Sequence, residues 1–156
     1  MLATDRLPEV RASAARALGN AQPAFALSVL SVLAADPEWF VRLRAVVGLS
    51  NFAHPETVRP LLLALCDPNR HVRQRAAWAL ARREPELESI FDQVVGTRDR
   101  YALEAFVSEL ERSGGFEKVV QAIQDRSPAE SAASILLKGL AVSRERAMSV
   151  AASGSR

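Results

Sequence analysis

Apolar residues recur at helical spacing over most of the chain, in short runs that turn residues separate. From residue 54 to residue 67 the leucines stand three or four residues apart, so they share one face of a helix. Pro55 suits the opening turn of that helix. The pair Asp67-Pro68 stops it, because the residue before a proline avoids helical dihedral angles. The pattern predicts a helix over residues 54–67.

A second helical stripe follows at once. Val72, Ala76, Ala79 and Leu80 fall on one face, and Pro85 ends the segment. The pattern predicts a second helix over residues 72–83. Each helix of this pair has an apolar face that the pair cannot bury by itself, so neighbouring pairs must stack.

This pattern of second helices occurs three times at steps of 31 residues. The stretches are DRLPEVRASAARAL from residue 5, DPEWFVRLRAVVGL from residue 36 and DPNRHVRQRAAWAL from residue 67. They share a skeleton of Asp, four residues, Val-Arg, two residues, Ala, three residues and Leu. A fixed period this short is typical of a repeat architecture.

The remaining helices follow from the same signals. The predicted helices are 9–19, 23–35, 41–51, 54–67, 72–83, 86–96, 98–115, 116–125 and 127–152. They divide a single domain, 1–152, into repeats at about 5–20, 21–51, 52–83 and 85–113, a degenerate C-terminal cap at 115–151 and a disordered tail at 153–156. The fourth repeat is weaker, and a 31-residue step places Tyr101 opposite Arg70.

The first copy supplies only its second helix. One interpretation is that the chain is a piece of a longer protein, in which a membrane anchor could precede the repeats. The other is that this end packs on another surface, such as a second copy of the chain. An uncapped solenoid end is otherwise a liability for solubility.

Two charged positions return with the repeat. Asp36 and Asp67 lie in the turns between helices, and Arg11, Arg42 and Arg73 begin the second helices. The planar fork of an arginine can reach turn carbonyls or the aspartate of an adjacent repeat. We expect a structural Asp–Arg ladder through the stack, since stacking requires the same residue in every repeat and a ligand rarely does. The alternative is an anion site.

The skeleton at this period resembles the HEAT repeats, and specifically their short phycobilisome-lyase-like subfamily in bacteria. DPEWFVRLRAVVGL looks close to the D-P-x-W-W-V-R-x2-A-A-x-A-L form of bacterial members, and RDRYALEAF resembles the unit that tends to close such arrays. The resemblance covers about residues 5–112. It implies an all-α, right-handed α-solenoid of four to five helix pairs, used mainly as an interaction scaffold. Some members attach or remove bilins, and more distant ones bind DNA or act on damaged bases.

Composition supports a helical protein and adds a charge asymmetry. Apolar residues make up 49% of the 156 residues and aromatic residues 6%, which favours packed helices over a sheet. Residues 1–83 contain 11 basic and 6 acidic residues, whereas residues 84–156 contain 9 and 12. The longest apolar run, Ala24 to Ala35, is too short to span a bilayer, and no signal peptide is evident, so we expect a cytoplasmic protein.

Catalytic and metal motifs are missing from the sequence. It contains no phosphate-binding glycine loop, HExxH or G-x-S-x-G, and no multi-cysteine metal site, because Cys66 is the one cysteine. A pairing of Cys66 with His71 lacks a third orienting group, so we expect a structural role for both. We therefore expect no catalytic residue, cofactor or metal.

The best candidate site is a surface on the second helices, which usually line the concave side of a solenoid. Opposite the core stripe lie an apolar centre of Leu43, Val47 and Trp78 and a polar surround of Arg16, Arg44, Gln74, Arg75 and Arg82. Tryptophan and arginine are the residues most enriched at binding hot spots. The alternative is that Trp78 packs as core. A second row, Trp39, Arg70 and Tyr101, either covers the repeat junctions or offers an aromatic edge to a ligand.

The sequence thus predicts a non-catalytic scaffold that binds a protein partner on the concave face. A nucleic-acid-binding helical repeat is the first alternative, supported by the basic front half. A bilin lyase or lyase subunit is the second, and it rests on the family resemblance alone.

Overall fold

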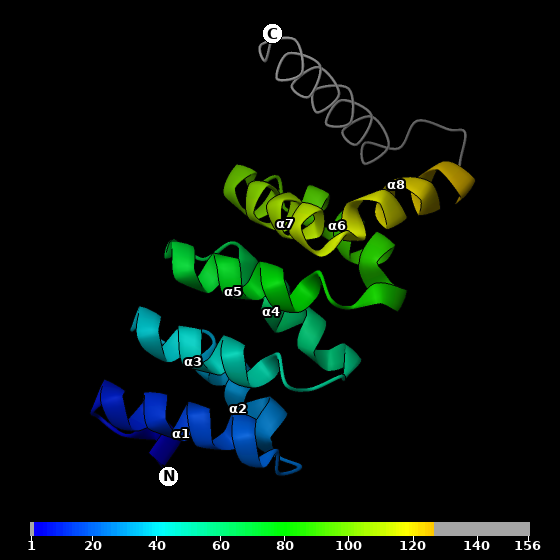
Figure 1. Cartoon of the computed structure of the whole chain (residues 1–156). Coiled ribbons are helices and arrows are strands. Elements are labelled where there is room, and N and C mark those ends of the chain that lie inside the picture. Colours follow the sequence, from blue (N-terminus) through cyan, green and yellow to red (C-terminus); the bar gives the residue numbers. More distant parts are fainter. Residues whose placement is uncertain (1, 127–156) are drawn as a thin grey trace, which may run out of the picture.

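The computed structural model describes residues 2–126, and this part of the chain contains eight α-helices, three short 3-10 turns and no strand. Four helices form one layer and stack in chain order: α1 (Pro8–Ala21), α3 (Trp39–Leu49), α5 (Arg70–Leu80) and α7 (Arg100–Ser113). A second layer behind them consists of α2 (Ala26–Leu33), α4 (Val58–Leu65) and α6 (Leu87–Gly96) (Figure 1). Helix α8 (Gly115–Arg126) packs against α6 and α7.

The helices lie where the hydrophobic pattern predicts them, with shifts at their ends. The prolines that open α4 and α6 sit in separate 3-10 turns, Pro55–Thr57 and Glu84–Glu86, before each helix begins. Helix α7 ends at Gly114, whose φ of 73° is left-handed, and α8 starts at the next residue. The predicted helix 127–152 and the tail 153–156 lie outside the described residues.

The buried positions show that the fourth repeat is set one residue early. Val72, Ala76 and Leu80 of α5 are fully buried, and so are their counterparts in α7, 30 residues later: Ala102, Phe106 and Leu110. The step from α3 to α5 is 31 residues, from Val41 to Val72. The loop after α5 accounts for the change, because buried Leu87 follows Leu80 by 7 residues, whereas buried Thr57 follows Leu49 by 8.

This shift corrects the sequence alignment of the fourth repeat. Arg100, and not Tyr101, occupies the place of Arg70, and Tyr101 occupies the place of His71. The cap of the helix sets this start, because Asp99 Oδ1 accepts hydrogen bonds from the backbone N–H groups of Tyr101 and Ala102 at 2.8 and 3.0 Å. In this 30-residue register, Thr97 is the residue of the fourth repeat that corresponds to Asp67.

Helices α1 and α3 approach each other closely at a pair of glycines. A Cβ on Gly19 would lie 2.5 Å from the Cα of Gly48, a distance that real Cβ atoms do not reach. A Cβ on Gly48 would in turn meet the Leu30 side chain at 2.9 Å. The absence of side chains at both positions permits the contact of α1 with α3.

We expect Gly19→Ala to lower the free energy of unfolding by about 1–3 kcal/mol, because backbone would have to move to admit the methyl group. Gly96→Ala is the matched control, since Gly96 is also helical and a Cβ there meets nothing within 4 Å. Urea denaturation of both variants measures the effect. Equal stability of the two variants would contradict the close approach.

Candidate functional site

Two arginine–aspartate pairs join successive repeats. Arg11 donates from Nε and Nη2 to the Asp36 carboxylate at 2.7 and 2.8 Å, and Arg42 donates in the same way to Asp67 at 2.6 and 3.0 Å. Each aspartate also accepts from the backbone N–H two residues later, in Glu38 at 3.0 Å and Asn69 at 2.7 Å. Each pair therefore fixes the turn of one repeat to the next.

These ion pairs are largely buried, so removal of either partner would leave a buried charge without its counterion. The side chains of Asp36 and Asp67 are 5% and 6% exposed, and those of Arg11 and Arg42 are 13% and 14% exposed. The hydrogen bonds from Arg11 hold the pKa of Asp36 below its ordinary value, although burial acts in the opposite direction. The charged form of Asp36 is thus part of the folded state.

The expected ladder of ion pairs stops before Arg73, which makes only the first of the two expected contacts, the one with turn carbonyls. Its Nη1 donates to the carbonyls of Asp67 and Pro68 at 2.8 and 2.9 Å. The residue that takes the place of the aspartate is Thr97, whose Oγ1 accepts from Asp99 N at 3.2 Å but has no charge. Among residues 2–126, no carboxylate forms an ion pair with Arg73, and its guanidinium lies 5.3 Å from the centroid of the Tyr101 ring.

The residues predicted to bind a partner lie in the layer of second helices. Arg16, Arg44, Gln74 and Arg82 are exposed, whereas Leu43, Val47, Arg75 and Trp78 are half-buried. Leu43 and Trp78 also pack against the core, so Trp78 contributes both to the core and to the surface. The apolar centre is therefore shallow and rimmed by charge.

Trp78 carries two guanidinium groups from its own segment. Those of Arg75 and Arg82 lie 3.9 and 4.1 Å from the ring centroid. Arg75 reaches Ser50 Oγ of the preceding repeat at 3.4 Å, and its Nε is buried without a hydrogen-bond partner among the described residues. Burial, and secondarily the charge of Arg82, lower the pKa of Arg75.

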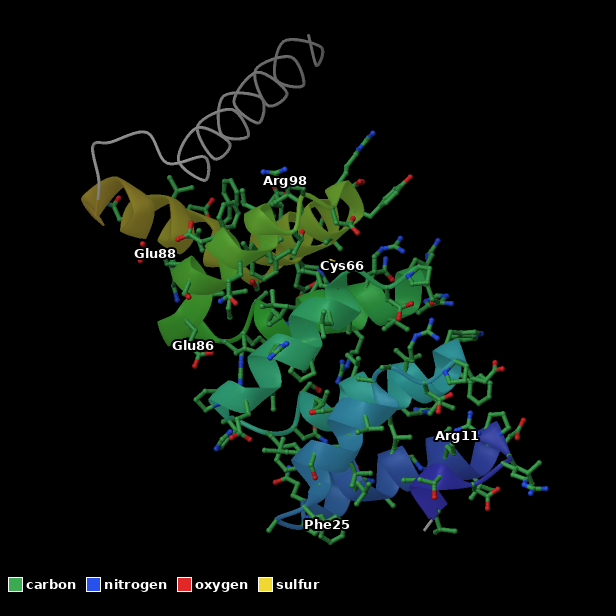
Figure 2. All side chains as sticks on the ribbon, turned by 180° about the vertical axis from the view of Figure 1, so that it is seen from behind. Arg11, Phe25, Cys66, Glu86, Glu88 and Arg98 are labelled. Carbon is green, nitrogen blue, oxygen red and sulfur yellow. The ribbon has the colours of Figure 1, made fainter. Side chains whose placement is uncertain are left out.

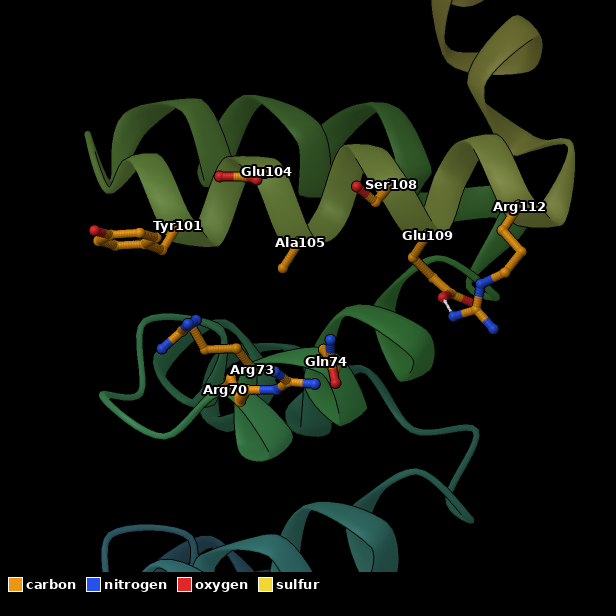
Figure 3. Close-up of a pocket in the computed structure, with 9 residues that line it drawn as sticks. All are labelled: Arg70, Arg73, Gln74, Tyr101, Glu104, Ala105, Ser108, Glu109 and Arg112. Atoms are coloured by element: carbon orange, nitrogen blue, oxygen red, sulfur yellow. Dashed lines mark ion pairs between the residues drawn. The ribbon is translucent and has the colours of Figure 1, made fainter.

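A groove between α5 and α7 continues this surface, and the sequence analysis did not predict it. It encloses about 550 Å³. The two helices face each other across it, with Tyr101 and Arg112 toward opposite ends of α7 (Figure 3). Its lining residues are Arg70, Arg73, Gln74, Tyr101, Glu104, Ala105, Ser108, Glu109 and Arg112.

Buried Glu109 links the groove to the tryptophan. Its carboxylate accepts from Arg82 Nη1 at 2.9 Å and pairs with Arg112, while its side chain is 3% exposed. The burial of Glu109 could not be recognised from the sequence, because the 31-residue register aligns it with Trp78, a predicted surface position. The 30-residue register aligns it with Ala79, which is buried.

Cys66 is half-buried, and His71 lies beside an aromatic ring. Burial raises the pKa of the half-buried Cys66 thiol, which lies in the layer of first helices seen from behind in Figure 2. The His71 ring lies 6.1 Å from that of Trp39, centroid to centroid, so these two rings lie side by side across the repeat junction. In residues 2–126, no three His, Cys, Asp or Glu side chains cluster as metal ligands would.

Helix α1 also borders a hollow. At the first helix, Leu2, Val10, Ala14 and Ala17 line an apolar hollow of about 420 Å³ with Glu9 and Ser13.

Within the described part of the chain, no helix has the length and apolar character needed to cross a lipid bilayer.

Comparison with known families agrees with this architecture. The family model described as HEAT repeats matches residues 1–81 and, in a second overlapping match, residues 27–109. The matches cover more than half of the chain, which belongs to the HEAT-repeat family. No curated protein matches the sequence.

The ion pairs predict unequal effects of removing equivalent arginines. We expect Arg42→Met to lower the free energy of unfolding by about 3–5 kcal/mol, because it leaves Asp67 buried without its partner. Arg73→Met removes hydrogen bonds to two turn carbonyls and the contact of the guanidinium with the Tyr101 ring, but no ion pair within residues 2–126, and should cost about 1–2 kcal/mol. Chemical denaturation measures both, and equal losses would show that the carboxylate adds nothing.

The lowered pKa of Asp36 predicts a pH-dependent contribution to stability. Since the folded pKa lies below the unfolded value of about 3.9, the unfolded chain binds more protons between the two values, and acid favours unfolding. We expect the difference in unfolding free energy between the parent and Asp36→Asn to be constant above about pH 5 and to shrink below about pH 4. Denaturation above about pH 5 and again below about pH 4 tests this, with Asp92→Asn, an exposed change on α6, as the control. A difference that does not shrink in acid would contradict the prediction.

Proposed function

We propose that this chain is a non-catalytic scaffold that binds a partner protein on its layer of second helices. On this proposal the layer is the concave side of a right-handed superhelix, as in the phycobilisome-lyase-like subfamily that the sequence resembles. The stack of Arg75, Trp78 and Arg82 is the observation that supports it best. These are residue types in which the energy of protein interfaces is concentrated.

The stack is held in place before any partner arrives. Arg82 is tied to buried Glu109 and to the backbone carbonyl of Trp78, at 2.9 and 3.0 Å, and Arg75 reaches Ser50. Side chains that are already ordered lose less entropy when they enter an interface.

The surroundings of the stack favour a partner with an apolar centre and an acidic rim. Leu43 and Val47 extend the half-buried apolar surface, and Arg16 and Arg44 project around it. Opposite charges at the rim of an interface increase the rate of association and set the register of the partner. Burial raises the pKa of the Cys66 thiol, which disfavours this thiol as a nucleophile.

Nucleic-acid binding is the second candidate, and the basic front half of the chain favours it. The Trp78 ring, however, already stacks with two guanidinium groups, so a base would have to displace one of them. Retention on DNA that falls steeply with added salt would support this candidate, because phosphate contacts release counterions. A bilin lyase has no support beyond the resemblance, and incubation with free bilin would reveal it as a new absorbance band.

We expect the double change Trp78→Ala/Arg75→Glu to weaken capture of a protein partner from lysate by about tenfold or more. The matched control is Leu63→Ala/Arg59→Glu, which makes the same kinds of change at exposed positions of α4 in the other layer. Quantitative mass spectrometry of the captured proteins, with nuclease-treated samples in parallel, measures the effect.

A second variant separates binding from folding, because Trp78 also packs against the core. Arg16→Glu/Arg44→Glu changes two exposed side chains. It should weaken capture of the same partner while leaving the melting temperature of the chain unchanged. If both surface variants retain what the parent captures, the layer of second helices is not the binding face. Loss of capture after nuclease treatment would favour the nucleic-acid candidate.

A further inference from the structure

Arg73 is held in the same way as the two arginines that bind aspartate. In all three, Nη1 donates to the carbonyls of the residues six and five positions earlier. The distances are 2.9 and 3.3 Å for Arg11, 2.8 and 2.8 Å for Arg42, and 2.8 and 2.9 Å for Arg73. The turn therefore presents the same guanidinium edge three times.

That edge holds a carboxylate in the first two repeats and none in the third. Nε and Nη2 of Arg11 and Arg42 grip Asp36 and Asp67 with two hydrogen bonds each. The corresponding residue, Thr97, already donates to Val94 O at 2.6 Å and accepts from Asp99 N. In the part of the chain that the structure describes, no hydrogen bond is formed by Nε or Nη2 of Arg73.

The unpaired edge lies beside open space. Arg73 and Tyr101 line the groove between α5 and α7 and also a second hollow of about 450 Å³, which Cys66, Pro68 and Asp99 border. Asp99 is bound to the first amides of α7 and forms no ion pair with Arg73 within residues 2–126. The Tyr101 ring against the guanidinium keeps Arg73 in position.

Charges of both signs surround this place, so the free donors of Arg73 are what favour an anion. Asp67 and Asp99 border the hollow, but Asp67 is paired with Arg42 and Asp99 caps α7. Arg70 adds a second positive charge to the same end of the groove, while Glu104 lies on the α7 side. Glu109, the other acidic residue of the lining, is already paired with Arg82 and Arg112. A guanidinium edge with two parallel N–H donors matches the geometry of a carboxylate. In the two preceding repeats the same edge of the equivalent arginine binds a carboxylate.

We propose that Arg73 and Tyr101 form a carboxylate-binding site, occupied by an aspartate or glutamate side chain of a partner protein segment that lies in the groove between α5 and α7. The partner's carboxylate completes the third pair of the ladder from outside. This inference rests on the proposed function, because it assumes that the partner protein docks on the layer of second helices. The fixed guanidinium loses little freedom on binding, which favours the contact.

The Nε–H signals of arginine in ¹⁵N NMR spectra of the full chain test the site directly. The probe is a capped hexapeptide, Ala-Asp-Leu-Asp-Ala-Ala, and the control peptide has Asn in place of both Asp. We expect the Arg73 signal to move toward those of Arg11 and Arg42 and to saturate below about 10 mM aspartate peptide. The Arg42 signal should stay in place, and the Asn peptide should move neither.

Substitutions at Thr97 provide a matched pair of variants. Thr97→Asp supplies the missing carboxylate from within the chain. The Arg73 signal should then move without peptide, and peptide affinity should fall by about tenfold or more. Thr97→Asn, of nearly the same size and without charge, should bind the peptide as the parent does. Arg73→Lys keeps the charge but lacks the fork, and we expect it to lose about tenfold in affinity.

Each other outcome overturns the site. An Arg73 signal that stays in place up to about 10 mM peptide excludes it. Undiminished binding by Thr97→Asp shows that the peptide contacts another surface. A response to inorganic phosphate at lower concentration than to the peptide identifies a general anion site instead. The proposed function is tested separately, since partner capture depends on Trp78 and peptide binding on Arg73.

Discussion

The stacking of this chain depends on a buried guanidinium that ties three segments together. Arg42 binds two carbonyls of the turn before its own helix and the carboxylate of Asp67 in the next turn, with Nε, Nη1 and Nη2 all donating hydrogen bonds. Withdrawal of two charges from water is costly, and the cost is offset only because the geometry satisfies these donors and the acceptor. A pair of this kind therefore specifies which turn faces which, and so the register of one repeat on the next.

The ladder ends because the fourth repeat has no carboxylate at the position of Asp67. The loop after α5 is one residue shorter, which puts Thr97 at that position, and the 31-residue register would have put Arg98 there. The core tolerates the shift, because Ala102, Phe106 and Leu110 still point inward from α7. The polar ladder cannot continue in either register, since a fork needs a carboxylate at this position and the chain has Thr97 or Arg98 there. The same shift leaves space at Arg73 and Tyr101, beside the groove between α5 and α7.

The two surfaces we connect with binding share one helix. Trp78 and its arginines lie on one side of α5, and Arg73 lies on the side that faces Tyr101 of α7. Arg82 joins them through buried Glu109, so the tryptophan stack and the groove are held by one network. A segment that enters the groove would thus meet fixed cations and a fixed aromatic ring without reorganisation of α5.

The sequence by itself determined the helices, their pairing and the first two arginine–aspartate pairs, because an apolar stripe at helical spacing and a 31-residue repeat are local and periodic signals. It also located Arg75, Trp78 and Arg82 on one surface. It could not determine that Trp78 is half-buried beneath two guanidinium groups, since that depends on side-chain packing between repeats. Nor could it place Thr97 opposite Arg73 or bury Glu109, because a one-residue difference in a loop leaves the apolar pattern readable in either register. Only the packing of α7 on α5 decided between the two registers, since burial of Ala102, Phe106 and Leu110 requires one of them.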